Sequence, residues 1–296
     1  MRPRLRPLAA ALSRSSDKHS FTPVEMYARC EMRFHLEEKS WTTIEDELRS
    51  SDTVIVPLGA LEAHGPHNPV GCCYLLAEAA SRDVGGRTGI PVTPTIPFGV
   101  SEGFASFPGT VTVSSEALRG YVDEACRSLI RSGFRKIIFF SAHGGNNLPV
   151  LRELSTRLRE EHGALCAVLH LWGLVQSLAQ HDAAEPGPRP GHGGDPTTSV
   201  MLHLHPELVD MSRAEWRPLR QPMEGLETSS YGVHAFKGIP LSIPLLVEEV
   251  APSGVLGDPT KASREKGRRL YERLVEYLAE FAEAFSGLEQ SLRRAA

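Results

Sequence analysis

One carboxylate and two imidazoles stand close together early in the chain, at Glu62, His64 and His67. They follow residues 53–56, a β-branched run that predicts a buried parallel strand ending near Pro57. In an open α/β sheet, ligands and reactions gather beyond the carboxyl ends of the strands. Carboxylate and imidazole on such a loop can face one point and suit Zn²⁺ or Mn²⁺, so the pattern indicates a metal site. The alternative is a polar loop whose histidines cap neighbouring backbone.

A second histidine-bearing loop strengthens this interpretation. Residues 136–140 form another apolar run, and His143 follows it, with Gly144 and Gly145 directly after. The glycines allow the backbone to approach an ion or a substrate closely. Since two predicted strands of one sheet both end near a histidine, we expect their loops to meet at a shared metal site.

The chain resembles the creatininase family, because five motifs occur in the family's order over roughly residues 40–285. The motifs are Pro57-Leu58-Gly59 with His64-Gly65-Pro66-His67, Phe107-Pro108-Gly109-Thr110, Gly133-Phe134 with His143-Gly144-Gly145-Asn146, His192-Gly193-Gly194-Asp195-Pro196-Thr197-Thr198-Ser199 with Pro206-Glu207-Leu208-Val209, and Gly257-Asp258-Pro259-Thr260. The resemblance implies an α/β fold, divalent metals, a homohexamer, and cleavage of C–N bonds other than peptide bonds, often in cyclic amides.

The chain also departs from the family pattern at three positions. Cys73 stands where the resemblance implies an aspartate that bridges two metals. Thr197 replaces a metal-binding glutamate, and Phe104 replaces a pocket histidine. The implied ligands that remain are Glu62, His64 and His143. A site for one metal is therefore expected in place of the family's pair.

Cys73 is a candidate fourth ligand. It lies at the start of a helix predicted over residues 74–83, where the helix dipole lowers the pKa of a thiol. A thiolate beside imidazoles favours zinc, with manganese or iron as alternatives. A buried free cysteine that only packs is the competing interpretation.

Composition indicates one large domain. At 296 residues, with 41% hydrophobic and 23% charged residues, the chain suits a single α/β domain, a mostly parallel sheet flanked by helices, over residues 32–296. Residues 1–31 are basic at their start and predict a disordered or weakly ordered extension. The formal charge of −4 and the lack of a long apolar run give no reason to expect nucleic acid or membrane as partners. Five unpatterned cysteines favour a reduced, cytoplasmic protein.

Local patterns place the remaining elements. Further strands are expected at residues 90–97 and 164–171, and helices at residues 42–49, 114–132, 148–162, 197–204 and 259–285. Asp258 is the expected N-cap of the terminal helix. Residues 181–194, rich in Pro and Gly, predict an ordered loop or lid over the site. Residues 211–250 give a weak signal, with irregular extension or an edge strand at residues 240–250.

The leading hypothesis is a metal-dependent amidohydrolase acting on an amide or cyclic amide of a small molecule. A cation at the site would polarise a carbonyl and acidify a bound water. His192 is the candidate acid/base, since imidazole transfers protons near neutral pH, and Asp195 orients it or replaces the carboxylate missing at Thr197. The candidate substrate-binding residues are Trp172, Phe104 and His67. The same residues would serve the condensing direction in a biosynthetic pathway.

Two other readings compete with this hypothesis. The loss of two metal carboxylates and one pocket histidine suits a catalytically degenerate relative kept as a binding or scaffold protein. The survival of the other candidate ligands and of His192 argues against it. A peptidase that trims a modified-peptide precursor is the third reading, because one branch of the family has that activity.

Overall fold

The computed structural model describes residues 34–182 and 191–288. These residues belong to one compact unit, Arg33–Ala296. The extension expected over residues 1–31, and the middle of the loop expected over residues 181–194, lie outside the described residues.

A three-stranded parallel sheet forms the centre of this unit. Its strands are β1 (Thr53–Leu58), β2 (Lys136–Ser141) and β3 (Leu165–His170), hydrogen-bonded in the order β1-β2-β3. Every residue of β1 and β2 is buried, as their unbroken apolar runs predict for a sheet covered on both faces. The strands expected at 53–56, 136–140 and 164–171 are therefore confirmed.

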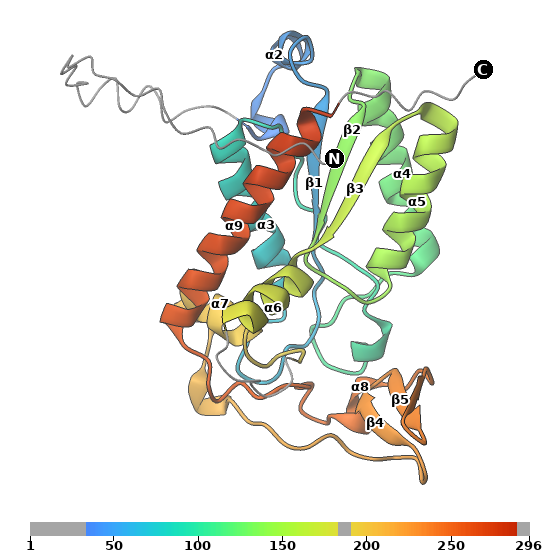
Figure 1. Ribbon diagram of the computed structural model, residues 1–296, viewed down its shortest axis with the longest axis vertical. Helices are drawn as coiled ribbons and strands as arrows, with labels where there is room; N and C mark the ends of the chain where they lie inside the picture. The colour runs from blue at the N-terminus through green and yellow to red at the C-terminus, as the bar shows by residue number, and fades with distance from the viewer. Residues whose placement is uncertain (1–33, 183–190, 289–296) are drawn as a thin grey trace, which may run out of the picture. The chain divides into compact units, whose positions relative to one another are not determined.

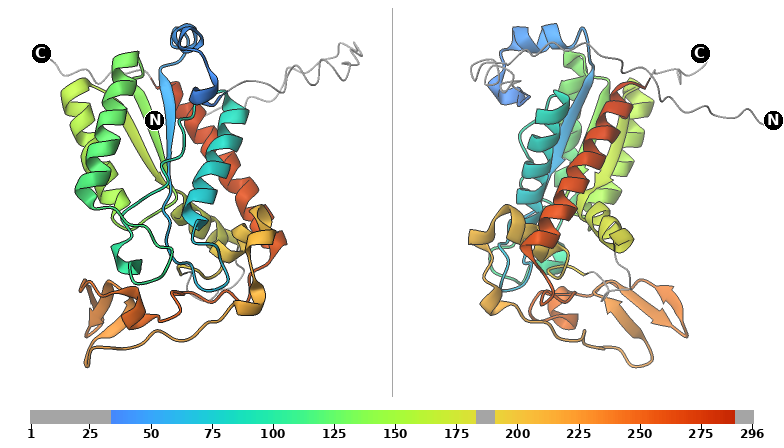
Figure 2. Two further views of the ribbon diagram at one scale, coloured as in Figure 1. Left: turned by 180° about the vertical axis from the view of Figure 1, so that it is seen from behind. Right: turned by 60° about the vertical axis from the view of Figure 1, so that its left-hand side comes forward.

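Helices cover both faces of the sheet (Figures 1 and 2). On one face lie α3 (Cys72–Thr88) and α9 (Arg264–Ser286), and on the other lie α4 (Ser115–Ser132) and α5 (Asn147–His162). Strand side chains alternate between two cores: Ile55 and Ile138 pack toward α3 and α9, whereas Val54 and Ile137 pack toward α4 and α5. The predicted fold class, a mostly parallel sheet flanked by helices, is confirmed.

Shorter helices complete the described chain. These are α2 (Trp41–Glu47), α6 (Leu171–Asp182), α7 (Thr197–Leu204) and α8 (Val247–Val250), with single 3₁₀ turns at Leu36–Glu38, Glu102–Phe104, Pro206–Leu208 and Met211–Arg213. The helix expected at 197–204 has the predicted bounds. The one expected at 114–132 is α4, and Ser114 is its N-cap, with a side chain that accepts a hydrogen bond from Ala117 N at 3.1 Å.

The strand expected at residues 90–97 is wrong as a regular strand. Val92 and Ile96 make only isolated parallel bridges to β1. Pro91, Pro94 and Pro97 recur every third position and lack the N–H that a continuous ladder requires. The segment therefore lies beside β1 but does not form a fourth strand of the sheet.

Two predicted helix boundaries are also wrong. Helix α3 continues beyond the expected end at residue 83 to Thr88, and Gly89 follows it with a φ of 71°. Gly85 lies inside the helix, and its lack of a side chain makes room for Phe34, since an added Cβ would lie 2.5 Å from that ring. The N-cap of α9 is Ser263, whereas the Asp258 side chain accepts a hydrogen bond from Thr260 N at 2.8 Å in the preceding turn.

A second, antiparallel sheet lies in the region that gave the weakest signal. Its strands are β4 (Glu227–Ser230), β5 (Val233–Phe236) and β6 (Ile239–Leu241), in the order β4-β5-β6. This sheet lies beyond the carboxyl ends of the parallel strands (Figure 1). The edge strand expected at 240–250 is thus limited to the end of β6, followed by α8.

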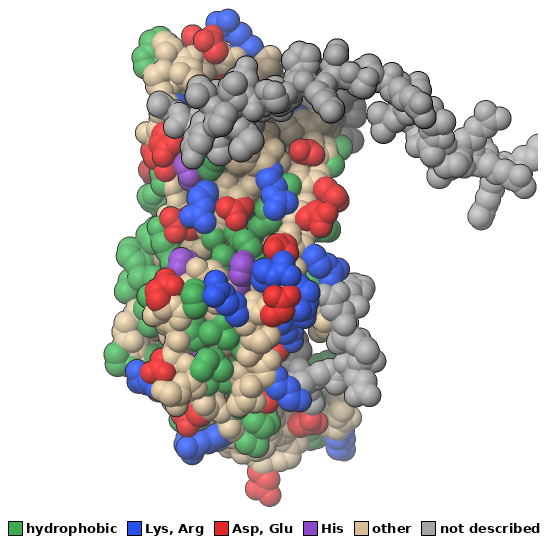
Figure 3. Space-filling model, turned by 90° about the vertical axis from the view of Figure 1, so that its left-hand side faces the viewer, with side chains coloured by type: hydrophobic (Ala, Val, Ile, Leu, Met, Phe, Trp, Pro, Cys, Tyr) green, Lys and Arg blue, Asp and Glu red, His purple; other side chains and the backbone are tan. Residues whose placement is uncertain are grey.

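The surface over α3 and α9 carries charges of both signs (Figure 3). Along α9, Arg268 pairs with Glu265 at 2.9 Å and with Glu272 at 2.8 Å. Interspersed charges of this kind are typical of a solvated helix face. Among the described residues, none of the helices combines the length and apolar character that a bilayer crossing requires.

Candidate metal centre

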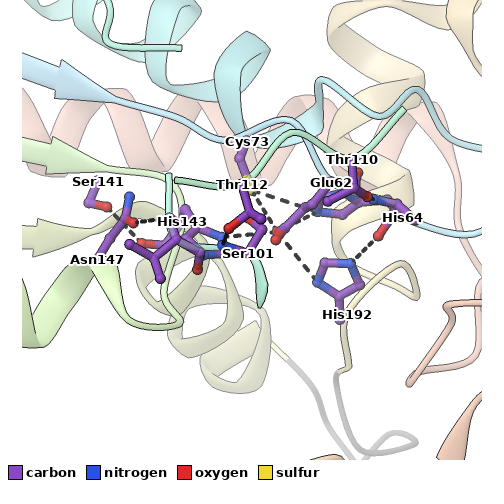
Figure 4. Close-up of polar contacts among 12 residues, drawn as sticks. Glu62, His64, Cys73, Ser101, Thr110, Thr112, Ser141, His143, Asn147 and His192 are labelled. Atoms are coloured by element: carbon purple, nitrogen blue, oxygen red, sulfur yellow. Dashed lines mark hydrogen bonds and ion pairs between the residues drawn. The ribbon is translucent and has the colours of Figure 1, made fainter. Parts of the chain in front are cut away.

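Glu62 is the centre of the site at the carboxyl end of the parallel sheet. The residue is 1% exposed, and four side chains converge on its Oε1 (Figure 4). The distances are 3.0 Å from His143 Nδ1, 3.4 Å from Cys73 Sγ, 3.8 Å from His64 Nε2 and 3.9 Å from His192 Nδ1. The second oxygen, Oε2, is buried without a hydrogen-bond partner among the described residues. A buried carboxylate with an unpartnered oxygen is a natural place for a cation.

Three histidines surround this carboxylate in the same manner. Each has one ring nitrogen on a backbone carbonyl: His64 Nδ1 lies 3.0 Å from Glu62 O, His192 Nε2 lies 2.6 Å from Ala63 O, and His143 Nε2 lies 2.9 Å from Val100 O. Because a carbonyl only accepts, the nitrogen beside it carries the proton and donates. The opposite nitrogen of each ring faces Glu62. Metal-binding histidines are fixed in this way, with one N–H held by an outer carbonyl and the other nitrogen on the ion.

The protonation of the site fits a ligand set. Burial opposes the charge on Glu62, but the surrounding His143, His192 and His64 outweigh it and lower the carboxyl pKa. Burial, followed by repulsion from His192, lowers the pKa of His64 to about 3. Burial also lowers the pKa of His192, although Glu62 opposes the shift. At neutral pH, His64 and His192 therefore present neutral imidazoles beside a carboxylate.

His143 differs from the other two histidines. Burial by itself would lower its pKa, but the Glu62 carboxylate and its hydrogen bond raise the pKa above the usual value. Both ring nitrogens of His143 face acceptors, and this favours the doubly protonated ring when no cation is bound. A divalent ion beside Glu62 would take the place of the Nδ1 proton.

Two overlapping groups of donors are present among the described residues. Glu62, His64 and His192 form one group, and Glu62, Cys73 and His143 form the other, with ligand atoms within 4.8 Å of one another in each. Carboxylate oxygen, imidazole nitrogen and thiol sulfur are all established ligands of divalent transition metals. The residues present therefore fit a divalent cation.

The expected lowering of the Cys73 pKa is wrong for the protein without a cation. Cys73 does lie in the first turn of α3, as predicted. However, burial, and then the negative charge of Glu62, raise the pKa of its thiol well above the usual value. The thiol instead donates a hydrogen bond to Glu62 Oε1. The helix dipole is outweighed because Cys73 is completely buried beside a carboxylate.

The Asp195 carboxylate pairs with groups other than His192. Its Oδ2 pairs with Lys266 Nζ at 2.5 Å, and its Oδ1 accepts a hydrogen bond from Ser199 Oγ at 2.6 Å. His192 is oriented by Ala63 O instead. The position of Asp195 therefore gives no support to the expectation that it orients His192 or replaces the carboxylate missing at Thr197.

His67 is buried next to the site without lining its cavity. Its Nε2 lies 3.0 Å from Thr198 Oγ1 and 3.0 Å from Asn68 Nδ2. Asn68 also donates to His64 O at 3.2 Å. This arrangement joins the loop after β1 to the start of α7, so His67 holds the loop in position.

A cavity of about 400 Å³ opens beside Glu62. Phe104 and Trp172 line it, as predicted for substrate-binding residues, and Thr197 lines it as well. The Phe104 ring packs on His192 at a centroid distance of 4.2 Å, and the His192 ring stacks on His64 at 4.0 Å. The cavity therefore places apolar rings and the acid/base candidate on the same side of Glu62.

Sequence reasoning missed several residues that line this cavity, and three of them carry polar side chains on or next to elements that can be named. They are His170, Gln176 and Tyr231. His170 ends β3, so it is a third histidine at the carboxyl end of a predicted strand, and that signal was available. Gln176 lies one helical turn after Trp172 on α6. Tyr231 lies between β4 and β5, a region whose strands the sequence did not indicate.

Comparison with known proteins agrees with this geometry. The family model for creatininase, described as creatinine amidohydrolase, matches residues 37–282. The chain belongs to the creatininase family. The resemblance inferred from the five motifs is thus confirmed, and so is the predicted function of an amidohydrolase at the level of this family.

Individual relatives span nearly the same length. Creatinine amidohydrolase of Pseudomonas putida is 32% identical over 259 residues, covering 82% of this chain and 94% of the relative. A mycofactocin precursor peptide peptidase of Mycobacterium ulcerans is 32% identical over 248 residues, covering 79% and 86%. Two solved creatininase structures, titled as a manganese form and as a variant of Zn-Zn type, have TM-scores of 0.72 and 0.71. Each is 26% identical and covers 86% of this chain and 99% of its own.

Proposed function

We propose that this protein is a metal-dependent hydrolase that cleaves an amide or cyclic-amide C–N bond, other than a peptide bond, in a small molecule. One observation carries the proposal: three histidines, each anchored to a backbone carbonyl, turn their other nitrogen toward one buried carboxylate beside a cavity. Such an arrangement is costly unless it binds an ion, because it gathers polar groups away from water. The similarity to creatinine amidohydrolase supports the bond type.

The residues that would hold the metal are Glu62, His64 and His143, with Cys73 as the fourth. A divalent cation there supplies a Lewis acid for the substrate carbonyl and lowers the pKa of water. Imidazole and thiol donors favour zinc, and the titles of solved relatives name zinc and manganese. One ion per subunit is proposed, because Cys73 replaces the implied bridging aspartate.

His192 is the proposed acid/base. Its Nε2–H is held by Ala63 O, which leaves the Nδ1 lone pair on the side of Glu62 and the cavity. A neutral imidazole in this tautomer can accept a proton at Nδ1 and return it to a leaving nitrogen. Phe104 packs on the ring, so the imidazole is kept in one orientation and partly shielded from water.

Activity and metal removal test the proposed function together. Purified protein is incubated with creatinine, with other small cyclic and linear amides, and with a short peptide, before and after dialysis against a chelator. Hydrolysis of a small amide that disappears with the metal and returns with zinc supports the proposal. Hydrolysis of the peptide alone would favour the peptidase reading, which the mycobacterial relative motivates. Metal-independent hydrolysis, or none of any substrate, would contradict the proposal.

The Cys73→Asp variant tests the role of the thiol. A carboxylate at this position should allow a second ion or shift the preference from zinc toward manganese, since carboxylates suit manganese. Cys73→Ser is the matched control, because it removes the thiol without adding a charge. If metal content and identity are the same in all three proteins, Cys73 only packs.

We also propose a homohexamer in a reducing, cytoplasmic setting. The four described cysteines, Cys72, Cys73, Cys126 and Cys166, are all free, as a reducing compartment would leave them. The hexamer is carried over from the resemblance alone. Light scattering at micromolar concentration that gives a monomer would contradict the oligomer, and it would leave the proposed chemistry unaffected.

A further inference from the structure

A second cavity adjoins the first on the other side of His143. It measures about 390 Å³ and shares Phe104, His143, Gly145 and Tyr231 with the cavity beside Glu62. The four shared residues show that the two cavities meet next to the metal centre.

Two aromatic rings mark the place where the cavities meet. Phe104 and Tyr231 pack edge-to-face with a centroid distance of 5.8 Å. Tyr231 is close to Gly103, where an added Cβ would lie 2.9 Å from the ring, so the absence of a side chain at position 103 makes room for it. An elongated substrate could thus lie beside the rings with one end in each cavity.

The polar residues that line the second cavity indicate which end of an elongated substrate it accepts. Glu102 and Glu249 line it, and none of its lining residues, all within the described chain, is Lys or Arg. Glu249 is held in place by a hydrogen bond from Leu246 N to its Oε2 at 2.6 Å. Ser101, labelled in Figure 4, also lines the cavity. Ser101 is 2% exposed, and its hydroxyl has no hydrogen-bond partner among the described residues.

The unpartnered Ser101 hydroxyl and the exposed carboxylates of Glu102 and Glu249 belong to residues that line the same cavity. Leaving a buried polar group unpaired costs about 1–3 kcal/mol, so the Ser101 hydroxyl favours a ligand that donates or accepts a hydrogen bond there. Two negative charges and no lysine or arginine favour a cation and disfavour an anion.

We propose that the second cavity is a substrate subsite for the ammonium-bearing end of a linear amide whose C–N bond lies beside His143. This inference rests on the proposed function and specifies its substrate class. The amide extends in both directions from the metal centre. One end occupies the cavity beside Trp172, and the cationic end lies between Ser101, Glu102 and Glu249.

Three acetamides of matched length test the inference. N-(4-aminobutyl)acetamide ends in an ammonium, N-pentylacetamide is neutral, and 4-acetamidobutanoate ends in a carboxylate. Binding to the zinc-loaded full chain is measured by calorimetry, and amine release is measured separately. Because exposed charge pairs are worth up to ~1 kcal/mol each, we expect the ammonium probe to bind about tenfold more tightly than the carboxylate probe.

Substitutions in the second cavity test which residues cause the preference for the ammonium probe. In the double variant Glu102→Gln/Glu249→Gln, we expect the preference to fall to about threefold or less, with metal content unchanged. The matched control is Glu116→Gln/Glu124→Gln, two exposed carboxylates on α4, which should keep the full preference. Ser101→Ala should weaken the ammonium probe several-fold, as the loss of one hydrogen bond predicts.

The outcomes separate this inference from the proposed function. Equal binding of the ammonium and carboxylate probes, or a preference that survives in the Glu102→Gln/Glu249→Gln variant, would overturn the subsite. If all three probes bind equally well and release amine at equal rates, the proposed hydrolase is supported and the proposed subsite is contradicted. If the ammonium probe binds preferentially but no amide is hydrolysed, the proposed subsite is supported and the proposed hydrolase is contradicted.

Discussion

The two sheets of the protein differ in how completely other parts of the chain bury them. Strands β1 and β2 are buried at every position and lie between two layers of helices. The antiparallel sheet exposes Val233, Phe236 and Ile239, at 48%, 49% and 70%. The parallel sheet positions Glu62 and His143, whereas the antiparallel sheet contributes Tyr231, which lines both cavities.

This difference separates the chemistry from the choice of substrate. Groups that hold a metal must keep their geometry, and a core buried on both faces restricts their movement. Groups that contact a variable substrate can lie on a sheet with an exposed face, where substitutions cost little stability. We therefore expect changes near the parallel sheet to have large effects, and changes on the outer face of the antiparallel sheet to have small ones.

The largest effect is expected from the metal centre. His64→Ala removes a ligand and should abolish both metal binding and activity. His192→Gln should lower turnover by ~10²–10⁴ while metal content is retained, because it removes only the proton acceptor. Metal analysis and turnover of both variants on one substrate separate the two roles. Full activity in His192→Gln would show that another group carries the proton, and loss of metal would make His192 a ligand.

The next largest effect concerns the packing of α7 on α9. Gly267 lies where an added Cβ would be 1.8 Å from Ser199 O. Gly267→Ala must push the two helices apart, so we expect a loss of stability on the order of 3 kcal/mol. Gly120→Ala is the matched control, since nothing lies within 4 Å of a Cβ there in α4, and it should stabilise by about 0.5–1 kcal/mol. Urea denaturation of both variants measures the difference, and equal stabilities would contradict the close packing.

A smaller effect is expected from pH. Burial, followed by repulsion from His143, lowers the pKa of His170 to about 4, from an ordinary value near 6.5. Between these values the unfolded chain binds a proton that the folded protein does not. Protonation therefore favours unfolding, and the stability of the metal-free protein should fall as pH decreases from about 6.5 to 4. His170→Gln should make this decline shallower in thermal unfolding scans, and an unchanged slope would contradict a partly buried, neutral His170.

The smallest effect is expected on the outer face of the antiparallel sheet. Ile239→Thr changes a residue that is 70% exposed in β6 and keeps the β-branched shape of its side chain. Stability should change by less than about 0.5 kcal/mol in the isolated subunit. A loss of several kcal/mol would show that this face is covered, and a fall in particle mass by light scattering would identify the cover as a second copy.

The sequence predicted the parts whose signals are local. Continuous apolar runs identified β1 and β2, and histidines just beyond such runs identified His64 and His143. The same rule, applied to His170 at the end of β3, would have found a further cavity residue. Prolines at every third position explain why residues 90–97 failed as a strand.

Other features depend on residues far apart in the chain. The partner of Asp195 is Lys266, on α9, and no local pattern links the two. Strands β4 to β6 are three or four residues long and lack a buried face with period two, so they leave little signal. The raised pKa of the Cys73 thiol follows from burial beside Glu62, which only the folded protein brings about.

The central claim is that one divalent metal is held at Glu62 by histidines whose outer nitrogens are fixed on backbone carbonyls. Elemental analysis of the purified protein, beside Glu62→Gln, tests it most directly. The variant keeps the shape of the side chain and removes its charge, and circular dichroism verifies that it folds. We predict about one zinc per subunit in the native protein and almost none in Glu62→Gln. Two tightly bound metals, none at all, or a metal content that survives in Glu62→Gln would contradict the claim.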